Sequence, residues 1–255
     1  MIALKRIATR YASLIAFIFV VLAWELGCDL FQVPTFVLPA PSAILVAFTT
    51  LSPSRWFEHT WATLEVALLG FVIATAIAVP LAIAITRSKL VSRVVMPWLI
   101  VIQSTPIVAI APIIVVTLGA GVLPRVVITT LIAFFPIVIS TATGLASVPA
   151  EFTELSRSLR ASRNREYWQI RMPYALPHLF SALRVAITLA IVGAVVAEFV
   201  AAERGLGYLI LYSTSSFRIA VAFAALVILV ASSLVLYGLI TQLQRRLFPW
   251  SEHRG

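Results

Sequence analysis

Few side chains in this sequence have the types and the spacing that catalysis or metal binding needs. The three histidines, His59, His178 and His253, are far apart, and the single cysteine, Cys28, excludes both an intrachain disulfide and a zinc site built on cysteines. Neither lysine follows a glycine, as the lysine of a P-loop does, and no G-x-S-x-G elbow is present. We therefore expect no catalytic residue, no metal site and no cofactor bound by this chain, which is predicted not to be an enzyme.

The composition defines the environment in which the chain folds. Of 255 residues, 61% are apolar and 11% are charged, and the formal net charge is +9. The mean hydropathy is +1.04. A water-soluble domain carries about 25% charged residues. The composition excludes a soluble enzyme, a disordered tail and a nucleic-acid-binding domain, and it predicts an all-α membrane protein with several spans.

Uncharged runs long enough to cross a bilayer give the expected helices. A helix needs about 20 apolar residues to cross a hydrocarbon core about 30 Å thick. The run 94–124 is too long for one span, and its LGAGVLP stretch supplies a break, which we place as an external turn. Six transmembrane helices are predicted in a single domain, residues 1–255, with spans at about 11–31, 62–86, 94–117, 125–146, 178–202 and 219–244.

The distribution of Lys and Arg predicts the orientation, because translocation of these residues is disfavoured. With the N-terminus inside, the cytoplasmic segments hold 15 of the 19 basic residues, and the external segments hold the other 4. Both termini are therefore predicted to be cytoplasmic. A cleavable signal peptide is the rival interpretation of the N-terminus, but no A-x-A cleavage pattern follows the first apolar stretch.

Polar residues interrupt the third predicted span. Gln103, Ser104 and Thr105 lie midway along it, and Pro106 follows them. Proline removes a backbone donor, and irregular backbone at membrane depth is tolerated only against protein or a water-filled cavity. These four residues are predicted to line a translocation pathway. Polar side chains that hold neighbouring helices together are the alternative interpretation.

Residues 146–177 form a cytoplasmic segment too long for a simple turn. Pro149 suits the first position of a helix, and Phe152, Leu155 and Leu159 then fall on one face. We predict a short amphipathic helix at about 149–162. Its apolar face has no core of its own, so lipid headgroups or another protein must cover it. A solvated loop with an interfacial helix is the alternative.

This segment resembles the cytoplasmic signature of the permease subunits of bacterial binding-protein-dependent ABC importers. That signature reads EAA, three residues, G, nine residues, then I-x-L-P, and Glu154, Ile170 and Pro173 lie at matching spacing. The departures are Leu155 and Ser156 for the two alanines, Arg160 for the glycine and Met172 for the leucine.

Four further stretches extend the likeness over nearly the whole chain. They are similar to the nitrate, sulfonate, taurine and thiamine-precursor branch of that family. The stretches are LPAPSAIL at 38–45, STPIVAIAP at 104–112, FFPIVIST at 134–141 and AEFVAAERGLGYLI at 197–210.

The resemblance implies a type I ABC importer permease-like bundle whose cytoplasmic helix is a coupling helix. In this family that helix fits a groove on an ATPase subunit. The contact residues carried over to this chain are Glu154, Leu155, Leu159, Arg160, Ala161 and Ser162. Glycine permits backbone conformations that arginine resists, so we expect Arg160 to keep a helical conformation and to add a charged contact.

The same resemblance assigns a role to the end of the fifth span. Glu198 lies near its external end, just before a GLGY turn. Glu198, Gly205 and Gly207 would form an external gate or a contact with a binding protein. An interfacial carboxylate paired with Arg204 or Arg218 is the alternative, and neither interpretation favours proton coupling.

The expected function is that of the permease subunit of an ATP-driven importer in the bacterial inner membrane. The implied partners are two copies of an ABC ATPase that uses ATP and Mg²⁺, an external substrate-binding protein, a second permease copy in a homodimer and the lipid bilayer, with no nucleic acid. The substrate class is a pyrimidine vitamin precursor, a sulfonate, taurine or nitrate. No Arg or Lys lies at midspan, which slightly favours a neutral or aromatic nutrient. The alternative function is an ion-coupled secondary transporter.

Overall fold

A computed structural model describes residues 2–251, and His253 lies outside them. No β-strand occurs in this part of the chain. The elements in chain order are α1 (Ile2–Leu30), α2 (Pro41–Ala47), α3 (Pro53–Arg87), α4 (Lys89–Ser104), α5 (Ile107–Leu118), α6 (Val122–Ala146), α7 (Ala150–Ser158), α8 (Arg163–Glu166), the π-helical turn η1 (Tyr167–Arg171), α9 (Met172–Ala201), α10 (Leu206–Ser215), α11 (Ile219–Leu247) and the 3-10 turn η2 (Pro249–Ser251).

Several helices are long and apolar enough to cross a membrane. Among the described residues these are α3, α6, the continuous helical stretch 163–201 that ends in α9, and α11. Helices α4 and α5 meet the same criterion together, as a pair bent by 96°. The described chain thus holds four candidate spans, or five if the bent pair is one span. This agrees with the membrane class that the composition predicted.

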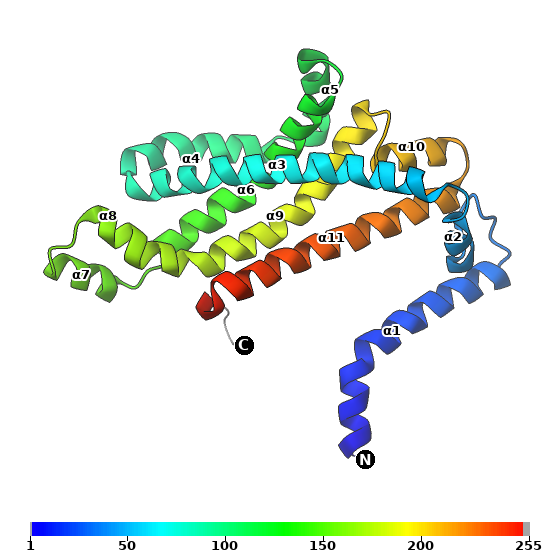
Figure 1. The fold of residues 1–255 in the computed structure, drawn as a ribbon, viewed down its shortest axis with the longest axis horizontal. Coiled ribbons are helices and arrows are strands. Elements are labelled where there is room, and N and C mark those ends of the chain that lie inside the picture. The colour runs from blue at the N-terminus through cyan, green and yellow to red at the C-terminus, as the bar shows by residue number, and fades with distance from the viewer. Residues whose placement is uncertain (1, 252–255) are drawn as a thin grey trace.

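Helices α3, α6 and α9 pack against one another and form the core of the bundle, with α11 beside α9 (Figure 1). Two of these helices bury an alanine at every fourth position. These are Ala74, Ala78 and Ala82 on α3, and Ala182, Ala186, Ala190 and Ala194 on α9. Residues four apart lie on one helix face. Side chains this small let helix backbones approach closely, which is how helices associate in membranes without a hydrophobic driving force.

Helices α6 and α9 approach each other closely at Gly144. A Cβ atom added to Gly144 would lie 2.7 Å from Cβ of His178 and 3.0 Å from Cα of Ala175. A larger residue there would push the two helices apart. The hydroxyl of Ser140 also donates to the His178 carbonyl at 2.9 Å, one turn further along the same contact. Close packing and a hydrogen bond therefore hold α6 and α9 together along this contact.

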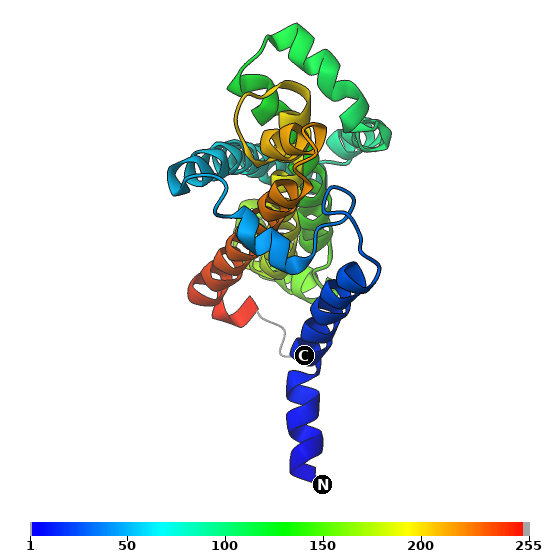
Figure 2. The same ribbon diagram turned by 90° about the vertical axis from the view of Figure 1, so that its right-hand side faces the viewer.

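The two ends of the bundle carry different elements. Helices α7 and α8 lie at one end, with the last turn of α3, whereas α10 and α2 lie at the other end (Figure 1). We refer to these as the α7 end and the α10 end. Helix α1 stands apart from the bundle and approaches it at the α10 end (Figures 1 and 2). There Glu25 accepts hydrogen bonds from the backbone N–H and the hydroxyl of Ser42, at 3.0 and 2.6 Å.

The predicted third span, 94–117, is divided between two helices, α4 and α5. Helix α4 ends at Ser104, and α5 starts at Ile107 after a turn of 96°. Thr105 is extended, with ψ at 124°. Proline lacks an N–H and disfavours the helical region for the residue before it, so Pro106 forces the break. The turn predicted at 118–124 is confirmed, because Gly119 and Gly121 have φ of 80° and 150°.

Helix α10 is a helix that the sequence analysis did not predict. It fills most of the loop expected between the fifth and sixth predicted spans. Its signal was weak, because ten residues are too few to span a membrane. Leu206, Leu209 and Ser213 nevertheless have helical spacing, and all three are buried.

Candidate functional site

The amphipathic helix predicted at 149–162 is a shorter helix, α7, followed by a turn. Arg160 donates its N–H to the carbonyl of Arg157 at 2.9 Å, and Ala161 donates to that of Ser156 at 3.0 Å. This pair of bonds is the Schellman motif, in which the second residue after the helix adopts a left-handed conformation. Ser162 then accepts from the Arg165 N–H at 3.3 Å and caps α8.

The expectation that Arg160 keeps a helical conformation is wrong. Its φ is +50°, in the left-handed region that glycine adopts freely and other residues adopt at a cost of about 1–2 kcal/mol. The Schellman bonds require this conformation and hold Arg160 in it. The glycine of the family signature corresponds to this position. Arginine therefore occupies a glycine position, and its side chain projects into solvent from the turn.

Helix α7 presents an exposed apolar surface next to charged groups. Leu155 and Leu159 are 56% and 72% exposed. Glu154 is exposed beside them, whereas Ser156 faces the bundle and is buried. Phe152 packs its ring 5.7 Å from that of Tyr174 on α9. Helix α7 is thus held to the bundle through Phe152 and Ser156, whereas the exposed surface formed by Glu154, Leu155 and Leu159, which we call the free face, is uncovered within the single chain.

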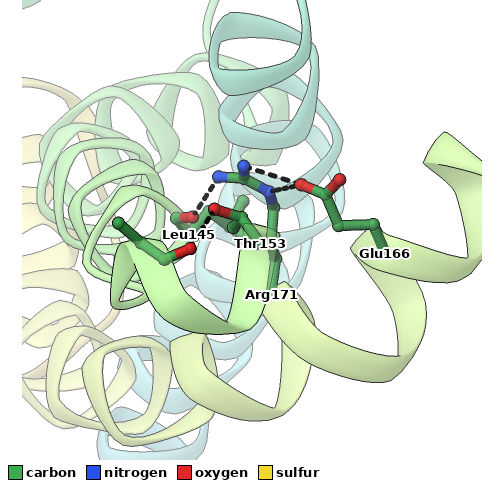
Figure 3. A network of polar contacts seen from close by, with 5 residues as sticks. Leu145, Thr153, Glu166 and Arg171 are labelled. Carbon is green, nitrogen blue, oxygen red and sulfur yellow. Dashed lines mark hydrogen bonds and ion pairs between the residues drawn. The ribbon is translucent and has the colours of Figure 1, made fainter. Parts of the chain in front are cut away.

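A half-buried guanidinium fixes the segment that follows α7. Arg171 donates through Nε to Glu166 at 2.8 Å and forms an ion pair with the same carboxylate at 2.8 Å. Its Nη1 donates to the carbonyl of Leu145 at the end of α6, at 3.2 Å. Figure 3 shows the guanidinium of Arg171 between the Glu166 carboxylate and the Leu145 carbonyl. The start of α9, helix α8 and the end of α6 are joined at this one side chain.

Glu198 lies at the α10 end and is 1% exposed. Its Oε1 accepts from the hydroxyl of Thr63 at 2.7 Å, and its Oε2 accepts from the N–H of Gly207 at 2.6 Å. The hydroxyl of Thr63 in turn accepts from the N–H of Leu206 at 2.8 Å. The first backbone donors of α10 have no partners inside the helix, and the positive end of its dipole favours an anion there. Glu198 and Thr63 supply these partners.

The alternative interpretation of Glu198, a carboxylate paired with Arg204 or Arg218, is not what the structure contains. Within residues 2–251, the ion pair found is that of Arg171 with Glu166. Both carboxylate oxygens of Glu198 are used by donors on α3 and α10 instead. Glu198 is also fully buried, so it does not lie in the partly hydrated setting that was expected.

The packing around Glu198 requires glycine at positions 205 and 207, because a side chain at either position would collide with Glu198. Gly205 has φ of +128°, and a Cβ atom there would overlap the carboxylate of Glu198. A Cβ atom on Gly207 would lie 2.8 Å from Oε2 of Glu198 and 2.9 Å from the carbonyl of Val195. The structure thus brings together all three residues that were assigned to the external gate.

Two members of this cluster were missed in the sequence. His59 accepts at Nδ1 from the N–H of Gly205 at 3.1 Å, and Thr63 bridges α10 and Glu198 as described. The available signal was their spacing: residues four apart on a helix present side chains to the same neighbour. Sequence analysis could not connect them with residues more than 130 positions away.

The four residues assigned to a translocation pathway lie at the α4–α5 break: Gln103, Ser104, Thr105 and Pro106. They belong neither to the contacts around Arg171 nor to the Glu198 cluster. The hydroxyls of Ser104 and Thr105 donate to the carbonyls of Ile100 and Val101, both at 2.8 Å. Gln103 is exposed, and its amide has no hydrogen bond to any part of the described chain. The side chain of Gln103 is thus the polar group available to a molecule at this break.

A cavity of about 740 Å³ opens close to the Glu198 cluster. Its charged lining residues are two carboxylates and two guanidiniums, from Glu58, Glu203, Arg125 and Arg204. Arg125 is buried and donates to the carbonyl of Gly121 at 2.9 Å. The α10 end therefore has a recess of mixed charge, next to the turn between α5 and α6.

A bundle of apolar spanning helices, with a polar break in one span and an exposed amphipathic helix at its basic end, has the architecture of a membrane permease. The sequence pattern of the family described as "binding-protein-dependent transport system inner membrane component" matches residues 70–249. The chain belongs to this family. The family resemblance inferred from the sequence is confirmed.

Individual relatives match over most of their length. The formylaminopyrimidine transport permease protein ThiX of Halalkalibacterium halodurans is 30% identical, over 97% of this chain and 98% of the relative. The riboflavin transport system permease protein RibX of Chloroflexus aurantiacus is 36% identical, over 89% and 85%. The taurine transport system permease protein TauC of Escherichia coli is 27% identical, over 89% and 85%.

The fold is also found in a solved transporter. A chain of the MetNI methionine ABC transporter, in an inward-facing conformation, superposes with a TM-score of 0.67. The match covers 80% of this chain and 100% of that chain, at 20% sequence identity. The bundle of this chain is therefore a known importer permease fold.

We expect that replacing Arg160 by Gly stabilises the turn after α7. Glycine removes the left-handed strain but adds backbone freedom in the unfolded state, so the net gain is small. Hydrogen exchange of residues 156–161 should slow by roughly two- to fivefold. Arg163→Gly, at the first position of α8, is the matched control and should speed exchange. Faster exchange in Arg160→Gly would contradict the assignment of the strain.

We expect that replacing Glu198 by Gln loosens α10. A glutamine has one acceptor oxygen where the carboxylate has two, so a buried donor on Gly207 or Thr63 loses its partner. A cysteine introduced at Ser213, which is 1% exposed, reports the opening through its rate of maleimide modification. That rate should rise about tenfold in Glu198→Gln. The exposed Glu203→Gln is the control, and equal rates in the two variants would contradict the role of Glu198.

Proposed function

We propose that the chain forms the membrane pathway of an ATP-driven importer and receives its driving force through α7. The observation that supports this most directly is the free face of α7, where exposed Leu155 and Leu159 lie beside Glu154. A short helix anchored on one face and apolar on the other is suited to a protein groove. Glu154, Leu155, Leu159, Arg160, Ala161 and Ser162 would be its contact residues, and the helix is the coupling helix of this permease.

The partner at this end is an ABC ATPase, present in two copies, which binds ATP and Mg²⁺ and hydrolyses ATP. Exposed arginines surround the free face of α7: Arg157, Arg160, Arg163 and Arg165. This concentration of positive charge supports a cytoplasmic position for the α7 end, because basic segments are retained on the cytoplasmic side. Both chain termini would then be cytoplasmic, in a bacterial inner membrane.

The pathway itself requires a second copy of the permease. Helix α1 would be the sixth span, and its exposed apolar side chains, such as Phe19 at 71%, would meet lipid or the second copy. The bent pair α4–α5 places Gln103 at a break in a span, where irregular backbone needs a water-filled cavity or protein beside it. In a homodimer, two such breaks would face a shared central pathway.

The α10 end would be the external side, where a substrate-binding protein delivers its cargo. Glu198, Gly205 and Gly207 hold α10 against α3, so release of this cluster would let α10 move. The cavity lined by Glu58, Arg125 and Arg204 offers charges of both signs to a docking protein. We propose that this cluster is the external gate.

The substrate class that we propose is a small, neutral, aromatic nutrient such as a pyrimidine vitamin precursor. Two relatives are named for heteroaromatic substrates, formylaminopyrimidine and riboflavin. The basic residue near the middle of α9, Arg184, donates to Gln244 within the bundle, which supports the same class over sulfonate, taurine or nitrate, since a freely available fixed cation would favour an anion.

Transport in proteoliposomes tests this function. The permease is reconstituted with its ATPase and its binding protein, and substrate uptake and ATP hydrolysis are measured together. We expect Leu159→Asp and Glu154→Ala to lower substrate uptake per ATP hydrolysed. A charge in an apolar groove costs several kcal/mol, so Leu159→Asp should have the larger effect, with uptake reduced at least tenfold.

Gln242→Asp is the control, because it adds the same charge at an exposed position near the end of α11. Unchanged coupling in both α7 variants would contradict the proposal. Uptake that continues without the ATPase and stops when an ionophore dissipates the ion gradients would instead establish an ion-coupled secondary transporter.

The pathway assignment has its own test. We expect Gln103→Ala to raise the substrate concentration needed for half-maximal uptake severalfold, while assembly with the ATPase is unchanged, because the amide contacts only the moving substrate. Gln169→Ala, an exposed glutamine in the π-helical turn, is the matched control. If Gln103→Ala transports as the parent does, the side chain holds helices together or serves no transport role.

A further inference from the structure

Two guanidinium groups lie over the ring of Tyr167. The Cζ atom of Arg87 is 5.4 Å from the ring centroid, and that of Arg171 is 5.2 Å from it. Both distances are within the range of a cation–π interaction, in which a cation is attracted to the electron-rich face of an aromatic ring. Tyr167 is half-buried, so water only partly screens these contacts.

This stack connects parts of the chain that are distant in sequence. Arg87 is the last residue of α3, and Tyr167 is the first residue of the π-helical turn after α8. Arg87 also donates through Nη2 to Oδ1 of Asn164 in α8, at 3.4 Å. Arg171 is held in place independently by Glu166 and by the Leu145 carbonyl. Arg87 is therefore the link from α3 to a segment that the Arg171 contacts already make rigid.

The same two helices that meet at this stack also meet at the opposite end of the bundle. Helix α3 carries His59 and Thr63, which bind the first residues of α10. The helical stretch that contains Tyr167 and Arg171 continues through α9 to Glu198, which binds α10 as well. A displacement of α8 that is transmitted to α3 would therefore act on α10 through both of the helices that hold it, α3 and α9.

Arginine is suited to the end of α3 for two further reasons. The negative end of a helix dipole lies at its C-terminus and favours a cation there. The planar guanidinium can stack on a ring and donate to Asn164 at once, which a lysine ammonium does less well. The contacts of Arg87 are thus specific to its side chain.

We propose that Arg87, Tyr167 and Arg171 form a joint that couples movement of the α7–α8 segment to α3, and through α3 to α10. Arg87 and Tyr167 are positioning residues in this proposal. The inference rests on the proposed function, because it takes α7 to be the helix that the ATPase moves.

The test compares Tyr167→Leu with Tyr167→Phe in the reconstituted complex of permease, ATPase and binding protein. Leucine removes both aromatic faces and keeps an apolar side chain, whereas phenylalanine keeps both faces. We expect Tyr167→Leu to lower substrate uptake per ATP hydrolysed roughly fivefold or more, and Tyr167→Phe to retain uptake. Binding of the ATPase to the permease should be the same in both variants, since the joint lies behind the contact surface.

A double-mutant cycle identifies the contact itself. Arg87→Gln keeps a donor for Asn164 and removes the cation. If Arg87 and Tyr167 act as one joint, the double variant Arg87→Gln with Tyr167→Leu should be no worse than the poorer single variant. Fully additive losses, or normal uptake per ATP in Tyr167→Leu, would overturn the proposal.

Refutation of the proposed joint and refutation of the proposed function would give different experimental results. If Leu159→Asp uncouples transport and Tyr167→Leu does not, α7 is the coupling helix and the joint is wrong. If Leu159→Asp leaves both ATPase binding and coupling unchanged, α7 is not the contact and both proposals fall. Spin labels at Ser158 and Lys89 add a structural readout. The distribution of distances between the two labels should broaden in Tyr167→Leu and stay narrow in Tyr167→Phe.

Discussion

Close packing of α6 against α3 and α9 is the constraint on which the rest of this structure depends. In a bilayer, association of helices gains little from burial of apolar side chains, because the lipid is equally apolar. Close contact through small residues stabilises the association of helices instead, and the buried alanines at every fourth position of α3 and α9 provide this contact. Gly144 extends the same contact toward the α7 end. The three helices consequently form one packed core, and α7 and α10 are attached at its two ends.

The attachments at the two ends use different chemistry. At the α10 end, a buried carboxylate and a threonine satisfy the free donors of a short helix, so the contact is dry and directional. At the α7 end, guanidinium groups of Arg87 and Arg171 hold a half-exposed segment through an aromatic ring, a carboxylate and a carbonyl. Loss of a buried hydrogen bond leaves an unpaired group, whereas a partly hydrated cation–π contact yields more gradually.

Arg160 illustrates how a departure from a family pattern is accommodated. The turn after α7 needs a left-handed residue, and the two Schellman bonds hold arginine in that conformation. The left-handed conformation is the one that the turn needs, and arginine adopts it at a cost that glycine does not have. Arginine places a charged side chain at the edge of the free face of α7, where a partner would meet it. A residue that is strained and exposed is more readily explained by an intermolecular contact than by the fold.

The sequence by itself determined the membrane class, the approximate bounds of α3, α6, α9 and α11, the amphipathic segment with Glu154, Leu155 and Leu159, and the family. These depend on composition, on uncharged run lengths and on spacing along one helix, all of which are local properties. Only the tertiary structure decided that Pro106 turns the chain by 96°, that Arg160 is left-handed and that Glu198 is buried. Only the tertiary structure showed that His59 and Thr63 contact α10 and that Arg87 contacts Tyr167. These features depend on which helices become neighbours, and periodicity along the chain carries no information about contacts between residues 80 to 146 positions apart.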